Sequence, residues 1–105
     1  MFNTIHPDQL NPSSARNNYF LVDLRSQHQF QNDGIAGSKH MPFHSLPEQY
    51  NQLPLEKEIV LICDDGKMAA AARNFLMGYA KLNNVVALEF GVQELHKKFE
   101  KRKAS

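Results

Sequence analysis

Residues 58–78 read EIVLICDDGKMAAAARNFLMG, and this stretch decides the fold. The four consecutive large aliphatic side chains at 59–62 lead into Cys63, which predicts a short strand buried on both faces. A tight polar turn at 64–66 follows, and the alanine-rich run at 67–77 is the strongest helix-forming sequence in the chain. A buried strand joined by a short turn to a helix is typical of a parallel α/β sheet.

Shorter patterns on either side extend this reading. Residues 19–24 and 85–89 are short apolar runs that predict two further buried strands. Residues 46–53 can form one or two helical turns, and Gly91 precedes an amphipathic helix. Because strands and helices alternate with short links, we expect an α/β fold in which a parallel sheet carries helices on both faces.

Length and composition fit one domain spanning residues 1–105. The chain has 105 residues, of which 42% are hydrophobic and 22% charged, close to the average for globular proteins. No apolar run approaches the roughly 20 residues needed to cross a bilayer, and the first residues lack the pattern of a secretory leader. We therefore expect a cytoplasmic protein with no membrane partner, either a monomer or a weak homodimer.

Charge is distributed unevenly along the chain. Residues 1–95 carry seven basic and ten acidic side chains, whereas the C-terminal residues 96–105 carry five basic and one acidic. A basic end can bind nucleic acid, but it also complements the negative C-terminus of a helix. We interpret this end as the solvated end of the last helix, and nucleic acid is not an expected partner.

Cys63 is the single cysteine, so it has no partner for an internal disulfide or a cysteine-based metal site. It is expected at the carboxyl end of a parallel strand, where ligands of α/β proteins bind. The backbone N–H groups of residues 64–69 can surround its sulfur, and the following helix dipole favours a thiolate by about 0.3–1 kcal/mol. A lone cysteine can equally be a small packing residue, and position alone leaves both readings open.

Several motifs in the same order resemble those of rhodanese-like domains. The resemblance covers about residues 3–98 and rests on these segments: Leu21-Val22-Asp23-Leu24-Arg25 followed by Phe30, Gly34-Ile35-Ala36-Gly37-Ser38, Met41-Pro42, Ile59-Val60-Leu61-Ile62-Cys63 with Gly66, residues 84–89, and Gly91-Val92. It implies a sheet of about five parallel strands flanked by helices on both faces.

The resemblance also implies a function. Cys63 would accept a sulfane sulfur as a persulfide and pass it to a nucleophile, with a small thiol or a protein as donor or acceptor and no cofactor. The loop would bind the substrate through Asp64, Asp65, Gly66, Lys67, Met68 and Ala69. Asp23 and Arg25 would have structural roles beside the pocket, and residues two apart at a strand end do point to the same side.

The loop departs from the family pattern. Active members typically end it with an arginine followed by Ser or Thr, whereas here Met68 and Ala69 occupy those positions. The Gly-Gly expected after the closing strand is Phe90-Gly91. Met68, Ala69 and the acidic pair at 64–65 favour an alternative function, a catalytically inactive module that keeps the fold for protein interaction or regulation. The retained Cys63 and Gly66 favour the sulfurtransferase, which is the leading interpretation.

Asp64 and Asp65 in the loop bear on whether the protein is a sulfurtransferase or an inactive module. A carboxylate about 6 Å from the sulfur disfavours a thiolate by roughly 3 kcal/mol at an effective dielectric constant of 20. If Asp64 or Asp65 points inward, Cys63 is a poor thiolate and thiosulfate, a dianion, is a poor donor, although Lys67 can offset one charge. The acids can instead serve the turn, with one of them capping the helix.

The residues argue against two other functions. A cysteine phosphatase of similar fold needs a loop one residue longer and an arginine within it, whereas the next arginine here is Arg73. His40 and His44 flank a proline and have no acidic or cysteine partner at ligand spacing, so no metal site is expected.

Overall fold

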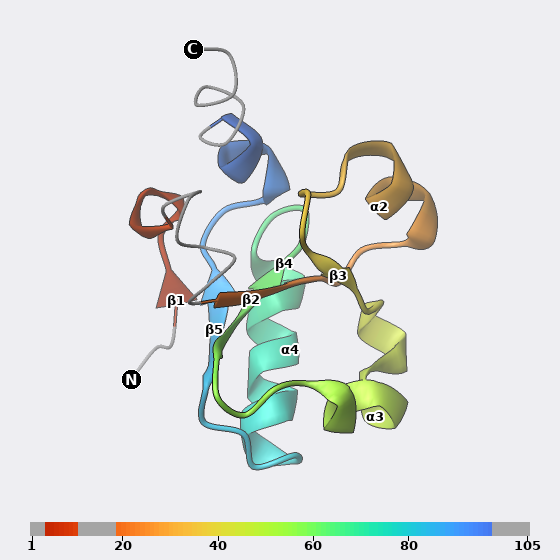
Figure 1. Ribbon diagram of the computed structural model, residues 1–105, viewed down its shortest axis with the longest axis vertical. Coiled ribbons are helices and arrows are strands. Elements are labelled where there is room, and N and C mark those ends of the chain that lie inside the picture. Colours follow the sequence, from red (N-terminus) through yellow and green to blue (C-terminus); the bar gives the residue numbers. More distant parts are fainter. Residues whose placement is uncertain (1–3, 11–18, 98–105) are drawn as a thin grey trace.

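The computed structural model describes residues 4–10 and 19–97 (Figure 1). Within them, five parallel strands form one sheet in the order β1-β5-β4-β2-β3. The strands are β1 (Thr4–Ile5), β2 (Tyr19–Asp23), β3 (Lys39–His40), β4 (Glu58–Ile62) and β5 (Val85–Leu88). The predicted α/β class and the five-stranded parallel sheet are confirmed.

The helical elements connect these strands or follow the last of them. They are η1 (Pro7–Gln9), α2 (Gln27–Asp33), η2 (Phe43–Ser45), α3 (Leu46–Gln49), η3 (Tyr50–Gln52), α4 (Lys67–Gly78) and a C-terminal helix whose described part is 92–97. The predicted helix after the cysteine turn and the predicted turns at 46–53 are present. The rest of the basic C-terminal end, from residue 98, lies outside the described residues.

The middle strand β4 separates two hydrophobic cores. Because side chains alternate along a strand, Ile59 and Leu61 face one side of the sheet and Val60 and Ile62 the other. All four are fully buried. This explains why the sequence of β4 is continuously apolar rather than alternating.

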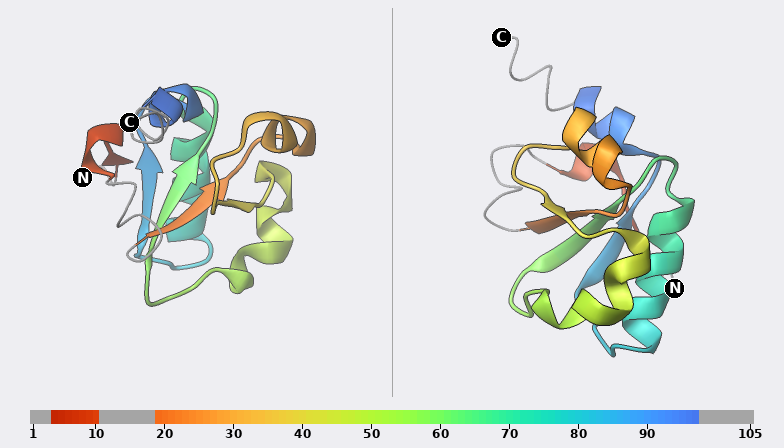
Figure 2. Two further views of the ribbon diagram at one scale, coloured as in Figure 1. Left: turned by 45° about the horizontal axis from the view of Figure 1, so that its top comes forward. Right: turned by 90° about the vertical axis from the view of Figure 1, so that its right-hand side faces the viewer.

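Each core is completed by helices. On the first face α4 contributes Ala69, Ala72 and Leu76, and Figure 2 shows this helix running along the strands. On the second face the C-terminal helix contributes Val92 and Leu95. Helices therefore cover both faces, as predicted.

The helix α2 was not predicted, because none of its seven residues is buried and it has no apolar stripe. It begins instead with a capping box, in which the Ser26 side chain accepts from the N–H of Gln29 and the Gln29 side chain accepts from the N–H of Ser26. No helix among the described residues is both long and apolar enough to cross a bilayer.

Candidate functional site

Cys63 follows β4 directly and begins the loop that leads into α4. Its side chain is buried, with 2% of the residue exposed. The Cys63 backbone is held as well, because the N–H of Val92 donates to the Cys63 carbonyl at 2.9 Å. The strand and this bond determine where the sulfur lies.

Two backbone N–H groups converge on the sulfur. Gly66 donates to Cys63 Sγ at 3.1 Å and Ala69 donates at 3.3 Å. Gly66 can do so because it has a φ of +90°, a left-handed conformation that favours glycine. The N-terminus of the twelve-residue helix α4 lies at the same place, so its dipole adds to these donors. The arrangement suits a sulfur atom that carries negative charge.

Cys63 opens into a pocket of about 600 Å³ between β2, β4 and the loops that follow them. Its wall is partly apolar and partly polar, and it is lined by Leu24, Arg25, Ser26, Gln29, Pro42, Phe43, His44, Cys63, Asp64, Asp65 and Met68. A small thiol compound, or the tip of a protein loop, is of suitable size for such a space.

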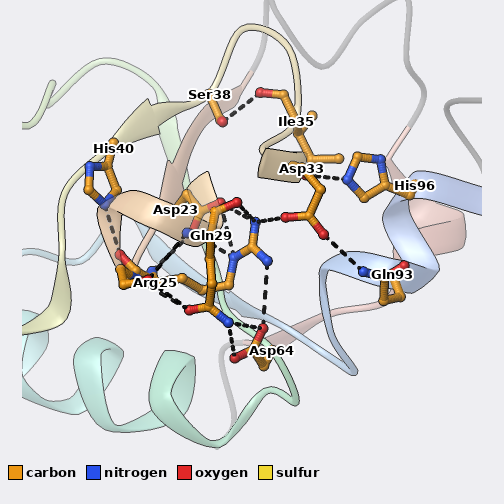
Figure 3. A network of polar contacts seen from close by, with 11 residues as sticks. Asp23, Arg25, Gln29, Asp33, Ile35, Ser38, His40, Asp64, Gln93 and His96 are labelled. Atoms are coloured by element: carbon orange, nitrogen blue, oxygen red, sulfur yellow. Dashed lines mark hydrogen bonds and ion pairs between the residues drawn. The ribbon is translucent and has the colours of Figure 1, made fainter. Parts of the chain in front are cut away.

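Arg25 lines the pocket and lies at the centre of a polar network (Figure 3). Its Nε donates to Asp23 Oδ1 at 3.1 Å and its Nη2 to Asp23 Oδ2 at 3.0 Å, while Asp33 Oδ1 lies 2.9 Å from Nη2. Burial alone would lower the pKa of Arg25, but the hydrogen bonds and charges of the two carboxylates outweigh it and raise the pKa above its ordinary value. Arg25 is a permanent cation whose charge is matched within the protein.

The Asp64 carboxylate belongs to the same network. Gln29 Nε2 donates to its two oxygens at 3.1 and 3.4 Å, and Arg25 Nη1 lies 3.6 Å from Oδ1. The Asp65 carboxylate instead accepts from the N–H of Lys67 at 3.0 Å, close to the helix-capping role considered for one of the acids. Both acids have partners other than the sulfur, and it is the backbone amides that contact Sγ.

The network also reaches the C-terminal helix. Asp33 Oδ2 accepts from Gln93 Nε2 at 3.1 Å, and the Asp33 carbonyl is hydrogen-bonded to the His96 ring. Figure 3 shows Asp33 between Arg25 on one side and these two residues on the other. The end of α2 is thereby tied to both the pocket wall and the C-terminal helix.

The predicted site residues lie around Cys63, but only some of them line the pocket. Cys63, Asp64, Asp65, Met68 and Arg25 line the pocket. Gly66 and Ala69 contact the sulfur through their N–H groups. The Lys67 side chain is exposed at the start of α4, and Asp23 is fully buried behind Arg25, where it has the bracing contacts expected of it.

Sequence reasoning missed Ser26, Gln29 and His44, which also line the pocket. The S-x-x-Q pattern of the capping box at 26–29 was a signal for the first two. No local pattern marks His44, because only the pairing of β2 with β3 and β4 brings its segment to the cysteine loop. In the part of the chain that the structure describes, no group of three or more His, Cys, Asp or Glu side chains could hold a metal ion.

Most of the chain matches one known protein family. The model of the rhodanese-like domain matches residues 6–98. This chain belongs to the rhodanese-like domain family. The resemblance noted from the motifs is therefore confirmed, and the matched range includes the pocket and the cysteine loop.

Relatives of this rhodanese-like domain include sulfurtransferases. The thiosulfate sulfurtransferase GlpE of Stutzerimonas stutzeri is 30% identical over 93 residues, which cover 88% of this chain and 83% of that protein. A sulfurtransferase of Allochromatium vinosum is 26% identical over 88 residues, 81% of this chain and 82% of that protein. Among solved structures, a rhodanese-related protein from Thermoplasma volcanium has a TM-score of 0.79 at 28% identity and covers 92% of this chain and 93% of its own.

Proposed function

We propose that this rhodanese-like domain is a sulfurtransferase that carries a sulfane sulfur as a persulfide on Cys63. The observation that carries the proposal is the position of Sγ, which lines the pocket and accepts from the N–H groups of Gly66 and Ala69. Two fixed donors at a helix N-terminus stabilise a negative sulfur before and after transfer without reorganisation. The names of the sulfurtransferase relatives agree with this chemistry.

The transfer is a pair of displacements at sulfur. The Cys63 thiolate attacks the outer sulfur of a donor persulfide, a new S–S bond forms, and the donor thiolate leaves with the bonding electron pair. With thiosulfate the leaving group is sulfite. An acceptor thiolate then attacks the outer sulfur on Cys63. The S–S bond to Cys63 breaks, and Cys63 leaves as a thiolate with the bonding electron pair.

The loop residues have distinct roles in this proposal. Gly66 and Ala69 hold the inner sulfur. Among the described residues, the loop N–H groups of Asp64, Asp65 and Met68 have no hydrogen-bond acceptor, so they are the candidates to bind the outer sulfur of the persulfide. Met68 supplies apolar pocket wall at the position where family members typically carry the loop arginine, and Phe43 extends this wall from η2.

The test is the mass of the intact protein after incubation with thiosulfate and, separately, with a low-molecular-weight persulfide. Because Cys63 is the only cysteine, a gain of one sulfur atom in the wild type that is absent from Cys63→Ser assigns the persulfide to this residue. Removal of the added sulfur by an acceptor thiol then shows transfer. Circular dichroism verifies that both proteins are folded.

The alternative, an inactive interaction or regulatory module, predicts the opposite result. The folded wild-type protein would gain no sulfur from either donor while its thiol remained free. That outcome would overturn the sulfurtransferase proposal, because the Cys63 sulfur would then accept no sulfur despite the two N–H groups that contact it.

A further inference from the structure

The Asp64 carboxylate occupies the one guanidinium nitrogen of Arg25 that the inner carboxylates leave open. Nε and Nη2 serve Asp23 and Asp33, whereas Nη1 lies 3.6 Å from Asp64 Oδ1. Figure 3 shows the guanidinium with Asp33 beside it and Asp64 below it, each joined to a different terminal nitrogen. Although Arg25 lines the pocket, each of its terminal nitrogens already has a carboxylate of this chain beside it.

Gln29 holds Asp64 in this position. Its Nε2 donates to both carboxylate oxygens, while its own Oε1 accepts from the N–H and the hydroxyl of Ser26 at 3.4 and 3.3 Å. The oxygen of the Gln29 amide is therefore oriented by the N-cap of α2, which leaves the nitrogen directed at Asp64. The Asp64 side chain remains 60% exposed on the pocket wall, so its charge is felt by anything that enters.

The charges around the pocket favour one class of donor. Asp64 and Asp65 both line it, and the lining cation, Arg25, is already paired with carboxylates. The Lys67 ammonium is exposed and is not part of the wall. A dianion such as thiosulfate meets net repulsion here, whereas a thiol-bound sulfur with no net negative charge does not.

We propose that Asp64 determines donor specificity: by occupying Arg25 Nη1 and presenting its charge to the pocket, it excludes anionic sulfur donors in favour of uncharged or amine-bearing persulfides. This inference rests on the proposed function and names the donor class of the same site. Gln29, in the first turn of α2, is a positioning residue, because it holds the Asp64 carboxylate in place.

The first experiment measures charge selectivity at Cys63 without any sulfur transfer. The rates of alkylation by iodoacetate, an anion, and by iodoacetamide, a neutral analogue, are compared as a ratio. Asp64→Asn should raise the iodoacetate-to-iodoacetamide ratio roughly threefold to fivefold, the size expected for removing one charge near a monoanion in a largely aqueous pocket. Asp64→Ala, which also uncovers Arg25 Nη1, should raise it further.

The second experiment repeats the comparison with sulfur donors. For Asp64→Asn, kcat/KM with thiosulfate relative to kcat/KM with cysteamine persulfide should rise roughly tenfold, because the repelled group is now a dianion. Asp65→Asn removes the same charge from the same loop without touching Arg25, and it should have a smaller effect. Glu48→Gln removes a charge from an exposed position on α3, outside the pocket, and should leave both ratios unchanged.

The outcomes separate the two proposals. Unchanged ratios in Asp64→Asn, or an equal rise in Glu48→Gln, would overturn the role of Asp64 even if sulfur transfer occurs. If the alkylation ratio rises in Asp64→Asn but the protein takes sulfur from no donor, the role of Asp64 in charge selectivity is supported. The sulfurtransferase proposal is then overturned instead.

Discussion

At the residue scale, Arg25 shows how two neighbours in the sequence become a buried pair. Asp23 ends β2 and Arg25 follows two residues later, so both side chains point into the same space, where 0% and 5% of each residue remain exposed. Removing one partner of a buried ion pair leaves the other charge uncompensated. Because the pKa of Arg25 is raised, its cationic contribution is fully present at every pH below its ordinary pKa.

Arg25→Met should therefore lower the free energy of unfolding by about 3–5 kcal/mol, since the Asp23 carboxylate is left buried without its cation. Urea denaturation followed by circular dichroism measures this loss. The double variant Asp23→Asn/Arg25→Met, which removes both charges, should recover part of it. A loss below about 1 kcal/mol in the single variant would contradict a structural role for the pair.

At the element scale, the segment after β5 packs backbone to backbone against the loop after β4. A Cβ placed on Gly91 would lie 1.7 Å from the carbonyl oxygen of Asp64, so no side chain fits there. The preceding residue, Phe90, has a φ of +68°, a left-handed conformation that favours glycine, the residue that the resemblance predicted there. The departure at Phe90 is tolerated as a left-handed residue, whereas Gly91 is required by the close approach.

Gly91→Ala should displace the cysteine loop, because the new methyl group and the Asp64 carbonyl cannot both stay in place. We expect a stability loss of about 1–3 kcal/mol and a fall of roughly tenfold or more in the rate at which Cys63 gains sulfur. Urea denaturation and mass spectrometry measure the two effects.

Gly78→Ala is the matched control, since a Cβ at this last residue of α4 meets nothing within 4 Å. It should leave the sulfur-transfer rate unchanged and raise stability by about 0.5–1 kcal/mol, because alanine favours the helix over glycine. Equal losses of activity in the two variants would contradict a specific role for the contact at Gly91.

At the scale of the whole molecule, one sheet carries two cores that share β4. Leu61 and Ile62 are adjacent in the sequence, both fully buried, and belong to the clusters on opposite faces. Neither face can unfold alone without exposing the strand that the other face packs against. The described domain should therefore behave as one cooperative unit.

Leu61→Ala and Ile62→Ala should each lower the free energy of unfolding by about 2–5 kcal/mol, the usual cost of a buried cavity of this size. Both should retain a single transition that coincides when followed by circular dichroism and by tyrosine fluorescence. Two separate transitions in either variant would show that the two faces unfold independently.

The strands β2, β4 and β5 and the helix α4 were predictable from short-range patterns, because each buries enough apolar side chains to leave a signal in its own sequence. The helix α2 buries no residue and β3 has two residues, so neither leaves an apolar pattern. The position of Cys63 at the end of a strand and the start of a helix was likewise predictable, since it depends on neighbouring residues alone.

The sequence by itself determined the α/β class, the cysteine loop and the acids at 64 and 65, because these depend on residues close together in the chain. The tertiary structure alone decided where the acids point. Gln29 and Arg25 reach Asp64 from 35 and 39 residues away, and they do so because parallel pairing of β2 with β4 brings the two loops to the same edge of the sheet. Such long-range contacts leave no mark on local sequence, and they place the charge that faces an incoming sulfur donor.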